Sequence, residues 1–174
     1  MSDIAITLPF APVFMILLSL CMLWVVISDA WNYIIPNTLN GIIIALYVAA
    51  VIFLPIDGWL GAVGAAVIVL AVGLGLFTLG LMGGGDIKLL VVLCLWTGWD
   101  MATLNFIFLT AIAGGLLVVV VLLMRLILPP IWLKVRPTRN LPRLLTRKEP
   151  VPYGIAIAAA FAWLLWNGGI ASLA

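Results

Sequence analysis

The chain has 174 residues, of which 67% are hydrophobic and only 8% are charged, and it contains no histidine. A soluble domain carries about a quarter charged residues, so this composition excludes a soluble globular protein and indicates a polytopic, all-α membrane protein. The lack of histidine excludes Ser–His and Cys–His nucleophilic chemistry and any imidazole-bound metal. We expect no nucleic-acid partner.

Six hydrophobic segments follow one another, at about residues 9–28, 39–53, 59–82, 86–96, 102–128 and 151–173. A transmembrane helix needs about 20 apolar residues, so we expect six transmembrane helices in a single domain, residues 1–174. No basic residue precedes the first segment, which predicts a retained helix rather than a cleaved signal. Cys21 and Cys94 lie singly in apolar segments, which predicts buried thiols rather than a disulfide or a zinc site.

The fourth segment is short and is expected to begin at Asp86. Apolar segments of about 10–14 residues are more often re-entrant or interfacial than spanning. We favour an arrangement in which Asp86 lies below the membrane surface, in a wet recess, so that a short helix suffices. Irregular backbone at that depth is tolerated where it faces a cavity or protein.

A polar stretch at about residues 129–150 sets the topology. It contains five prolines, which argue against one long amphipathic helix, and six of the eight Lys and Arg residues: Lys134, Arg136, Arg139, Arg143, Arg147 and Lys148. The positive-inside rule places this basic loop in the cytoplasm, where it rests on anionic lipid headgroups or grips a substrate. Counting back through the segments puts the junctions at residues 29–37 and 83–86 on the same, cytoplasmic, side.

The six acidic residues are Asp3, Asp29, Asp57, Asp86, Asp100 and Glu149. The same count places three of them on the outer side and one in the basic loop, so only Asp29 and Asp86 end hydrophobic segments on the inner side. Ionisable residues at membrane depth are functional candidates by default. The alternative is structural, with Asp29 at a helix end and Asp86 as the N-cap of the fourth helix.

Two carboxylates a few ångströms apart in a poorly solvated recess cannot both ionise, and they therefore share one proton. The ionised member accepts a proton from a water that attacks a peptide carbonyl, and the protonated member donates to the developing oxyanion. The pair titrates as a unit, so neither aspartate receives a separate role. This chemistry requires no metal and no cofactor.

The three glycines before Asp86 fit such a site, because glycine permits unusual backbone angles and close approach of another chain. Alternatively, they only end the third helix. Lys88 lies two residues beyond Asp86, hence on a different helix face, and is expected to snorkel to the headgroups, as is Arg125.

Three motifs together resemble the type IV prepilin peptidase family, membrane aspartyl proteases of the GxGD type. Residues 83–86 match the GxGD signature, Asp29 is followed at the family's spacing by an Ile-Pro-Asn stretch at residues 35–37, and residues 151–158 resemble the Pro-Tyr-Gly stretch that opens the last helix. The resemblance implies that Asp29 and Asp86 are the catalytic pair. It implies substrate binding or motif support for Gly83, Gly84, Gly85, Pro36, Asn37, Lys88, Pro152, Tyr153 and Gly154.

The resemblance further implies removal of the leader peptide from prepilins or pseudopilins at the cytoplasmic face of the bacterial inner membrane, with lipids and the pilus assembly machinery as partners. Residues 30–34 lack the basic residues that the family usually carries there. The chain also lacks the paired-cysteine cytoplasmic domain of the large bifunctional members. It therefore resembles the small, peptidase-only branch that serves Flp/Tad pili, without N-methyltransferase activity.

Two alternatives come from other classes of protein. In a small proton-coupled transporter the aspartates would act as a relay, but the two halves of the sequence show no convincing inverted repeat. A non-enzymatic assembly subunit would be held together by glycine-mediated helix packing, which does not explain why both inner aspartates coincide with motifs.

Overall fold

The computed structural model describes residues 10–54, 56, 58–135, 142–146, 149–170 and 173, apart from the side chains of residues 133, 135 and 143. This part of the chain is helical throughout its regular structure, which confirms the all-α prediction. Its elements are α2 (Ala11–Asn32), α3 (Asn37–Phe53), α4 (Trp59–Thr78), α5 (Gly84–Thr97), α6 (Met101–Val135), the 3₁₀ helix η1 (Arg143–Leu145) and α7 (Tyr153–Trp166).

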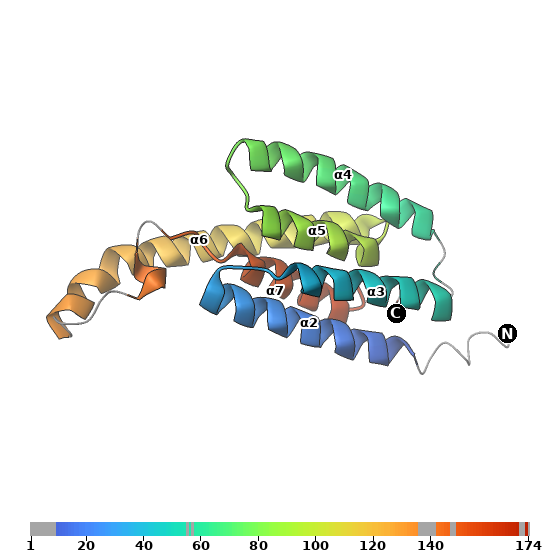
Figure 1. The fold of residues 1–174 in the computed structure, drawn as a ribbon, viewed down its shortest axis with the longest axis horizontal. Helices are drawn as coiled ribbons and strands as arrows, with labels where there is room; N and C mark the ends of the chain where they lie inside the picture. Colours follow the sequence, from blue (N-terminus) through green and yellow to red (C-terminus); the bar gives the residue numbers. More distant parts are fainter. Residues whose placement is uncertain are drawn as a thin grey trace.

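The six α-helices lie side by side and alternate in direction (Figure 1). α4 packs against α5, α5 also packs against α3, and α7 packs against both α2 and α6. The end of α2, the end of α4 and the starts of α3, α5 and α7 meet at one end of the bundle, beyond which α6 extends. The two aspartate junctions, which the sequence placed on one side, thus lie at the same end of the bundle.

Within the described residues, three helices are long and apolar enough to cross a membrane: α2, α4 and the Met101–Trp132 part of α6. α3 and α7 are shorter apolar helices. The outer faces of the bundle expose large apolar side chains, among them Ile16, Leu20 and Val72, which are 54%, 57% and 60% exposed. Exposed apolar surface of this extent marks a membrane-facing surface, and the chain is a polytopic membrane protein.

The structure corrects the expected limits of the fourth helix. α5 begins at Gly84, not at Asp86, because Gly83 is the N-cap and the chain is helical immediately after it. Asp86 is consequently the third helical residue rather than the cap. With 14 residues, α5 is about 21 Å long, shorter than the hydrocarbon core of about 30 Å.

The fifth segment also differs from expectation. Its helix continues through Pro129 and Pro130 to Val135 instead of ending near residue 128. Proline removes a hydrogen-bond donor but holds φ near the helical value, so the helix passes through this pair. Residues 136–141, 147 and 148, which carry four of the basic side chains predicted for the loop, lie outside the described residues, as do Asp3 and Asp57.

Aromatic side chains hold the core of the bundle. Trp96 of α5 is 2% exposed, and its indole meets the edge of Tyr47 with ring centroids 5.5 Å apart. Its Nε1 donates to the carbonyl oxygen of Ile43 at 3.4 Å, which ties α5 to α3. Cys21 and Cys94 are free and buried, as predicted.

Candidate functional site

Asp29 lies in the last turn of α2 and is 4% exposed. Tyr33 ends the helix in the left-handed conformation, with φ 56°, and its N–H donates to the carbonyl oxygen of Asp29 at 3.0 Å. Ser28 Oγ donates to the carbonyl oxygen of Ile34 at 2.7 Å. These hydrogen bonds turn the chain directly after Asp29 and set the position of its carboxylate at the helix end.

Gly83 and Asp86 interact within the first turn of α5. The Gly83 N–H faces the Asp86 carboxylate, as in the reciprocal contact of a capping box. A Cβ atom on Gly83 would lie 2.8 Å from Asp86 Oδ2, which is too close without displacing the carboxylate. A side chain at position 83 would therefore shift Asp86 from its place in the cavity.

The other two glycines of the motif have more room. A Cβ atom on Gly84 or Gly85 would make only ordinary contacts, at 3.6 Å from Phe77 and from Ile35 respectively. None of residues 83–85 has a positive φ, so the expectation of unusual backbone angles there is wrong. The chain enters α5 through extended backbone that any residue adopts.

The start of α7 meets Asp29. The backbone N–H groups of Gly154 and Ile155 face the Asp29 carboxylate, although Oδ2 itself makes no hydrogen bond of normal geometry. A helix amino terminus carries partial positive charge and stabilises an anion. A Cβ atom on Gly154 would lie 2.8 Å from Asp29 Oδ2, so the absence of a side chain at position 154 permits this approach.

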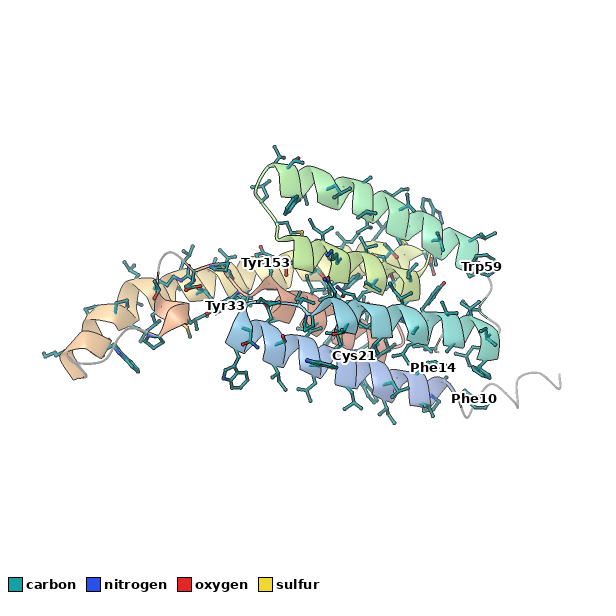
Figure 2. The ribbon with its side chains drawn as sticks, in the orientation of Figure 1. Phe10, Phe14, Cys21, Tyr33, Trp59 and Tyr153 are labelled. Atoms are coloured by element: carbon teal, nitrogen blue, oxygen red, sulfur yellow. The ribbon has the colours of Figure 1, made fainter. Side chains whose placement is uncertain are left out.

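Pro152 and Tyr153, in the Pro-Tyr-Gly stretch, pack at the start of α7. Pro152 is buried and occupies the N-cap position of α7. The Tyr153 ring packs against Gly114 of α6, so closely that no Cβ would fit between them. Figure 2 shows Tyr33 and Tyr153 at the same end of the bundle, opposite Phe10 and Trp59.

A cavity of about 400 Å³ joins these parts of the chain. Its lining residues are Asp29, Tyr33, Ile34, Ile35, Asn37, Gly83, Gly84, Gly85, Asp86, Lys88, Pro150 and Val151. Both aspartates selected from the sequence line this cavity, so the structure brings them together. In the described part of the chain, no three Cys, Asp or Glu side chains gather as metal ligands.

Lys88 lies in the same cavity as Asp86, although helical spacing placed the two on different faces. Its Nζ donates to Asn37 Oδ1 at 3.1 Å instead of only snorkelling towards headgroups. Pro36 is the N-cap residue of α3 and directs Asn37 into the first turn. The Ile-Pro-Asn stretch is thus tied to α5, two residues beyond Asp86.

Sequence reasoning missed several residues of the site. Tyr33 and Pro150 line the cavity but were not selected from the sequence, and Val151, which also lines it, was noted only as the first residue of the stretch at residues 151–158. The expectation that Arg125 snorkels is wrong: its side chain is only 8% exposed. An arginine at a helix end looks the same in sequence whether its head reaches water or backbone carbonyls.

The family model described as the type IV leader peptidase family matches residues 16–119. This match covers more than half of the chain. The chain belongs to the type IV leader peptidase family. The resemblance inferred from motifs is confirmed at this level, and the match includes both aspartates, whereas the stretch at residues 151–158 lies beyond it. No curated protein and no solved structure matched the chain.

Family membership makes this chain a leader peptidase in general terms, with prepilins as its class of substrate. The three long apolar helices agree with a peptidase that works in a membrane.

Proposed function

We propose that the protein is an aspartic endopeptidase that removes the leader peptide from type IV, Flp-like prepilins at the cytoplasmic face of the bacterial inner membrane. The observation that carries the proposal is that Asp29 and Asp86, far apart in the sequence, line one cavity at one end of the bundle. Two carboxylates that share an enclosed site are the arrangement from which aspartic proteases work.

In the proposed reaction the pair holds one proton. The ionised carboxylate takes a proton from a water molecule as the water oxygen attacks the carbonyl carbon of the scissile peptide bond. The protonated carboxylate gives its proton to the carbonyl oxygen, forming a neutral diol. One carboxyl group then gives its proton to the amide nitrogen, while the other carboxylate takes a proton from a hydroxyl of the diol. The C–N bond breaks to give the carboxylic acid of the leader and the free amine of the mature pilin, and the pair again holds one proton.

The surroundings of the pair support an extended substrate. Gly84 and Gly85 line the cavity without side chains, so a peptide backbone has room to lie beside Asp86. Lys88 and Asn37 form one wall through their hydrogen bond. Their remaining donor and acceptor capacity suits contacts with substrate carbonyls and amides.

The proposed orientation rests on charge and length. α6 extends beyond the bundle at the end that holds the cavity (Figure 1) and carries the exposed Lys134, the first residue of the basic stretch that the positive-inside rule places in the cytoplasm. The short α5 supports a recess that opens to this side.

The narrower assignment to the Flp/Tad branch, without N-methyltransferase activity, is carried by the motif resemblance. Both cysteines of the chain are free and buried in the helix bundle, unlike the paired cysteines of the bifunctional members. Mass spectrometry of the mature pilin checks this part of the proposal: an unmethylated new amino terminus is expected.

The proposal is tested by co-expressing a Flp-type prepilin and following leader cleavage in membranes. Asp29→Asn and Asp86→Asn should each lower the rate by about 10²–10⁴-fold, the usual contribution of a positioned acid or base, while both variants still insert into the membrane.

Asp100→Asn is the matched control. Asp100 lies at the opposite end of the bundle, where its Oδ1 accepts from the Met101 N–H at 2.6 Å, and asparagine caps a helix as well as aspartate does. This variant should cleave at the wild-type rate. Cleavage that persists in both Asp29→Asn and Asp86→Asn would overturn the aspartic mechanism.

A further inference from the structure

Arg125 is a buried cation on α6, outside the cavity. Its Nε donates to the carbonyl oxygen of Leu144 at 2.9 Å. Its Nη2 donates to the carbonyl oxygens of Glu149 at 2.8 Å and Pro150 at 3.2 Å. One planar guanidinium thus holds both ends of a segment that begins at η1 and finishes directly before α7.

The held segment forms part of the cavity. Pro150 and Val151 line it together with both aspartates, and the chain then enters α7 through Pro152. In the first turn of α7 lies Gly154, whose N–H faces Asp29. A shift of the segment would therefore move a cavity wall and the amino end of α7 relative to the Asp29 carboxylate.

The same helix braces α7 at a second point, because the Tyr153 ring packs closely against Gly114 of α6. Arg125 and Gly114 thus lie on one helix and secure consecutive parts of the chain, residues 149–150 and residue 153. The guanidinium suits this task because its fork of N–H donors is rigid.

We propose that Arg125 is a positioning residue, which holds Leu144, Glu149 and Pro150 so that Pro150 and Val151 close the cavity and α7 begins against Asp29. The proposal rests on the proposed function, since it assigns Arg125 to the geometry of that same site. Arg125 does not line the cavity and acts only through the segment that it holds.

The test compares Arg125→Gln and Arg125→Lys with the wild type in detergent, by amide hydrogen exchange and by leader-cleavage kinetics. In Arg125→Gln, exchange over residues 149–156 should become faster while exchange in α4 stays unchanged. We expect kcat to fall roughly 10–100-fold with KM nearly unchanged, because small misplacements of a catalytic group cost rates of this order. Arg125→Lys keeps the positive charge but loses the planar set of N–H donors. Its exchange rates and kcat should lie between those of the wild type and Arg125→Gln.

Lys134→Gln is the matched control, because it removes a positive charge from the same helix at an exposed position. It should leave both exchange and kcat at wild-type values. If Arg125→Gln fails to fold, Arg125→Lys carries the comparison.

The proposal would be overturned if hydrogen exchange at residues 149–156 of Arg125→Gln were unchanged, or if exchange rose equally in α4. It would also be overturned if the wild type cleaved prepilin and Arg125→Gln had the same kcat. If the wild type itself cleaves no prepilin, the proposed function fails, and the exchange data alone still decide whether Arg125 holds the segment.

Discussion

The Asp29 carboxylate occupies the space in which a side chain at position 154 would begin. This contact joins the end of α2 to the start of α7, and it places two backbone N–H groups towards the buried carboxyl group. The Asp86 carboxylate is placed in a similar way, against the backbone of Gly83. Each aspartate carboxylate thus lies against the backbone of a glycine. A larger residue in place of that glycine would displace the carboxylate.

Gly154→Ala should lower the rate of leader cleavage by about tenfold or more, because the added Cβ displaces the Asp29 carboxylate and small displacements have large kinetic effects. Gly115→Ala in α6 serves as the control, since a Cβ there would meet nothing within 4 Å and Gly115 does not line the cavity. It should cleave at close to the wild-type rate. Cleavage kinetics on purified variants check both, and a fully active Gly154→Ala would contradict the role assigned to this contact.

The helices are coupled at the site by a small number of polar contacts. The hydrogen bond from Lys88 to Asn37 joins the start of α3 to the start of α5, and the hydrogen bonds of Arg125 join α6 to the segment before α7. Away from the cavity, α3 and α5 are also joined by the edge-on contact between Trp96 and Tyr47 and by the hydrogen bond from Trp96 to the carbonyl oxygen of Ile43. The contacts of Lys88 and Arg125 orient the elements that carry the cavity.

Asn37→Ala and Lys88→Met should each reduce kcat/KM, and the double variant should lose little more than the worse single variant, because both remove the same hydrogen bond. Both residues are exposed, so the coupling should stay below about 1.5 kcal/mol, the upper range for an ordinary hydrogen bond. The four proteins form a double-mutant cycle. Fully additive losses would show that the two side chains act independently.

The two ends of the bundle differ. The start of α7 and the extension of α6 lie at one end (Figure 1), where the cavity is lined by both aspartates. The opposite end carries the turn at Trp99 and Asp100, whose side chains are exposed. If the proposed orientation holds, these two ends face different compartments.

Variants with one added cysteine, at position 134 or at position 100, test the orientation. The native Cys21 and Cys94 can stay in place because they are buried and should react slowly. In intact spheroplasts, a membrane-impermeant maleimide should label Asp100→Cys and leave Lys134→Cys unmodified until the membrane is opened. Labelling of both from the outside would refute the alternating topology. Labelling of Lys134→Cys alone would invert it and place the cavity on the outer side.

The all-helical class, the approximate helix positions and the selection of Asp29 and Asp86 as candidates follow from the sequence. Length of apolar segments and scarcity of charge are local properties, and an aspartate beside an apolar segment stands out without knowledge of its neighbours. Alternation of direction then suffices to put both aspartates at one end. The family match confirmed the resemblance that the motifs suggested.

Other properties of the site depend on contacts between residues remote in the chain. The sequence suggested unusual backbone angles at residues 83–85 and a snorkelling Arg125, whereas the fold shows a close approach at Gly83 and a buried guanidinium. It also shows that Lys88 binds Asn37 and that Gly154 receives Asp29. Helical periodicity describes one helix at a time, whereas these contacts exist only once α3, α5, α6 and α7 are packed together.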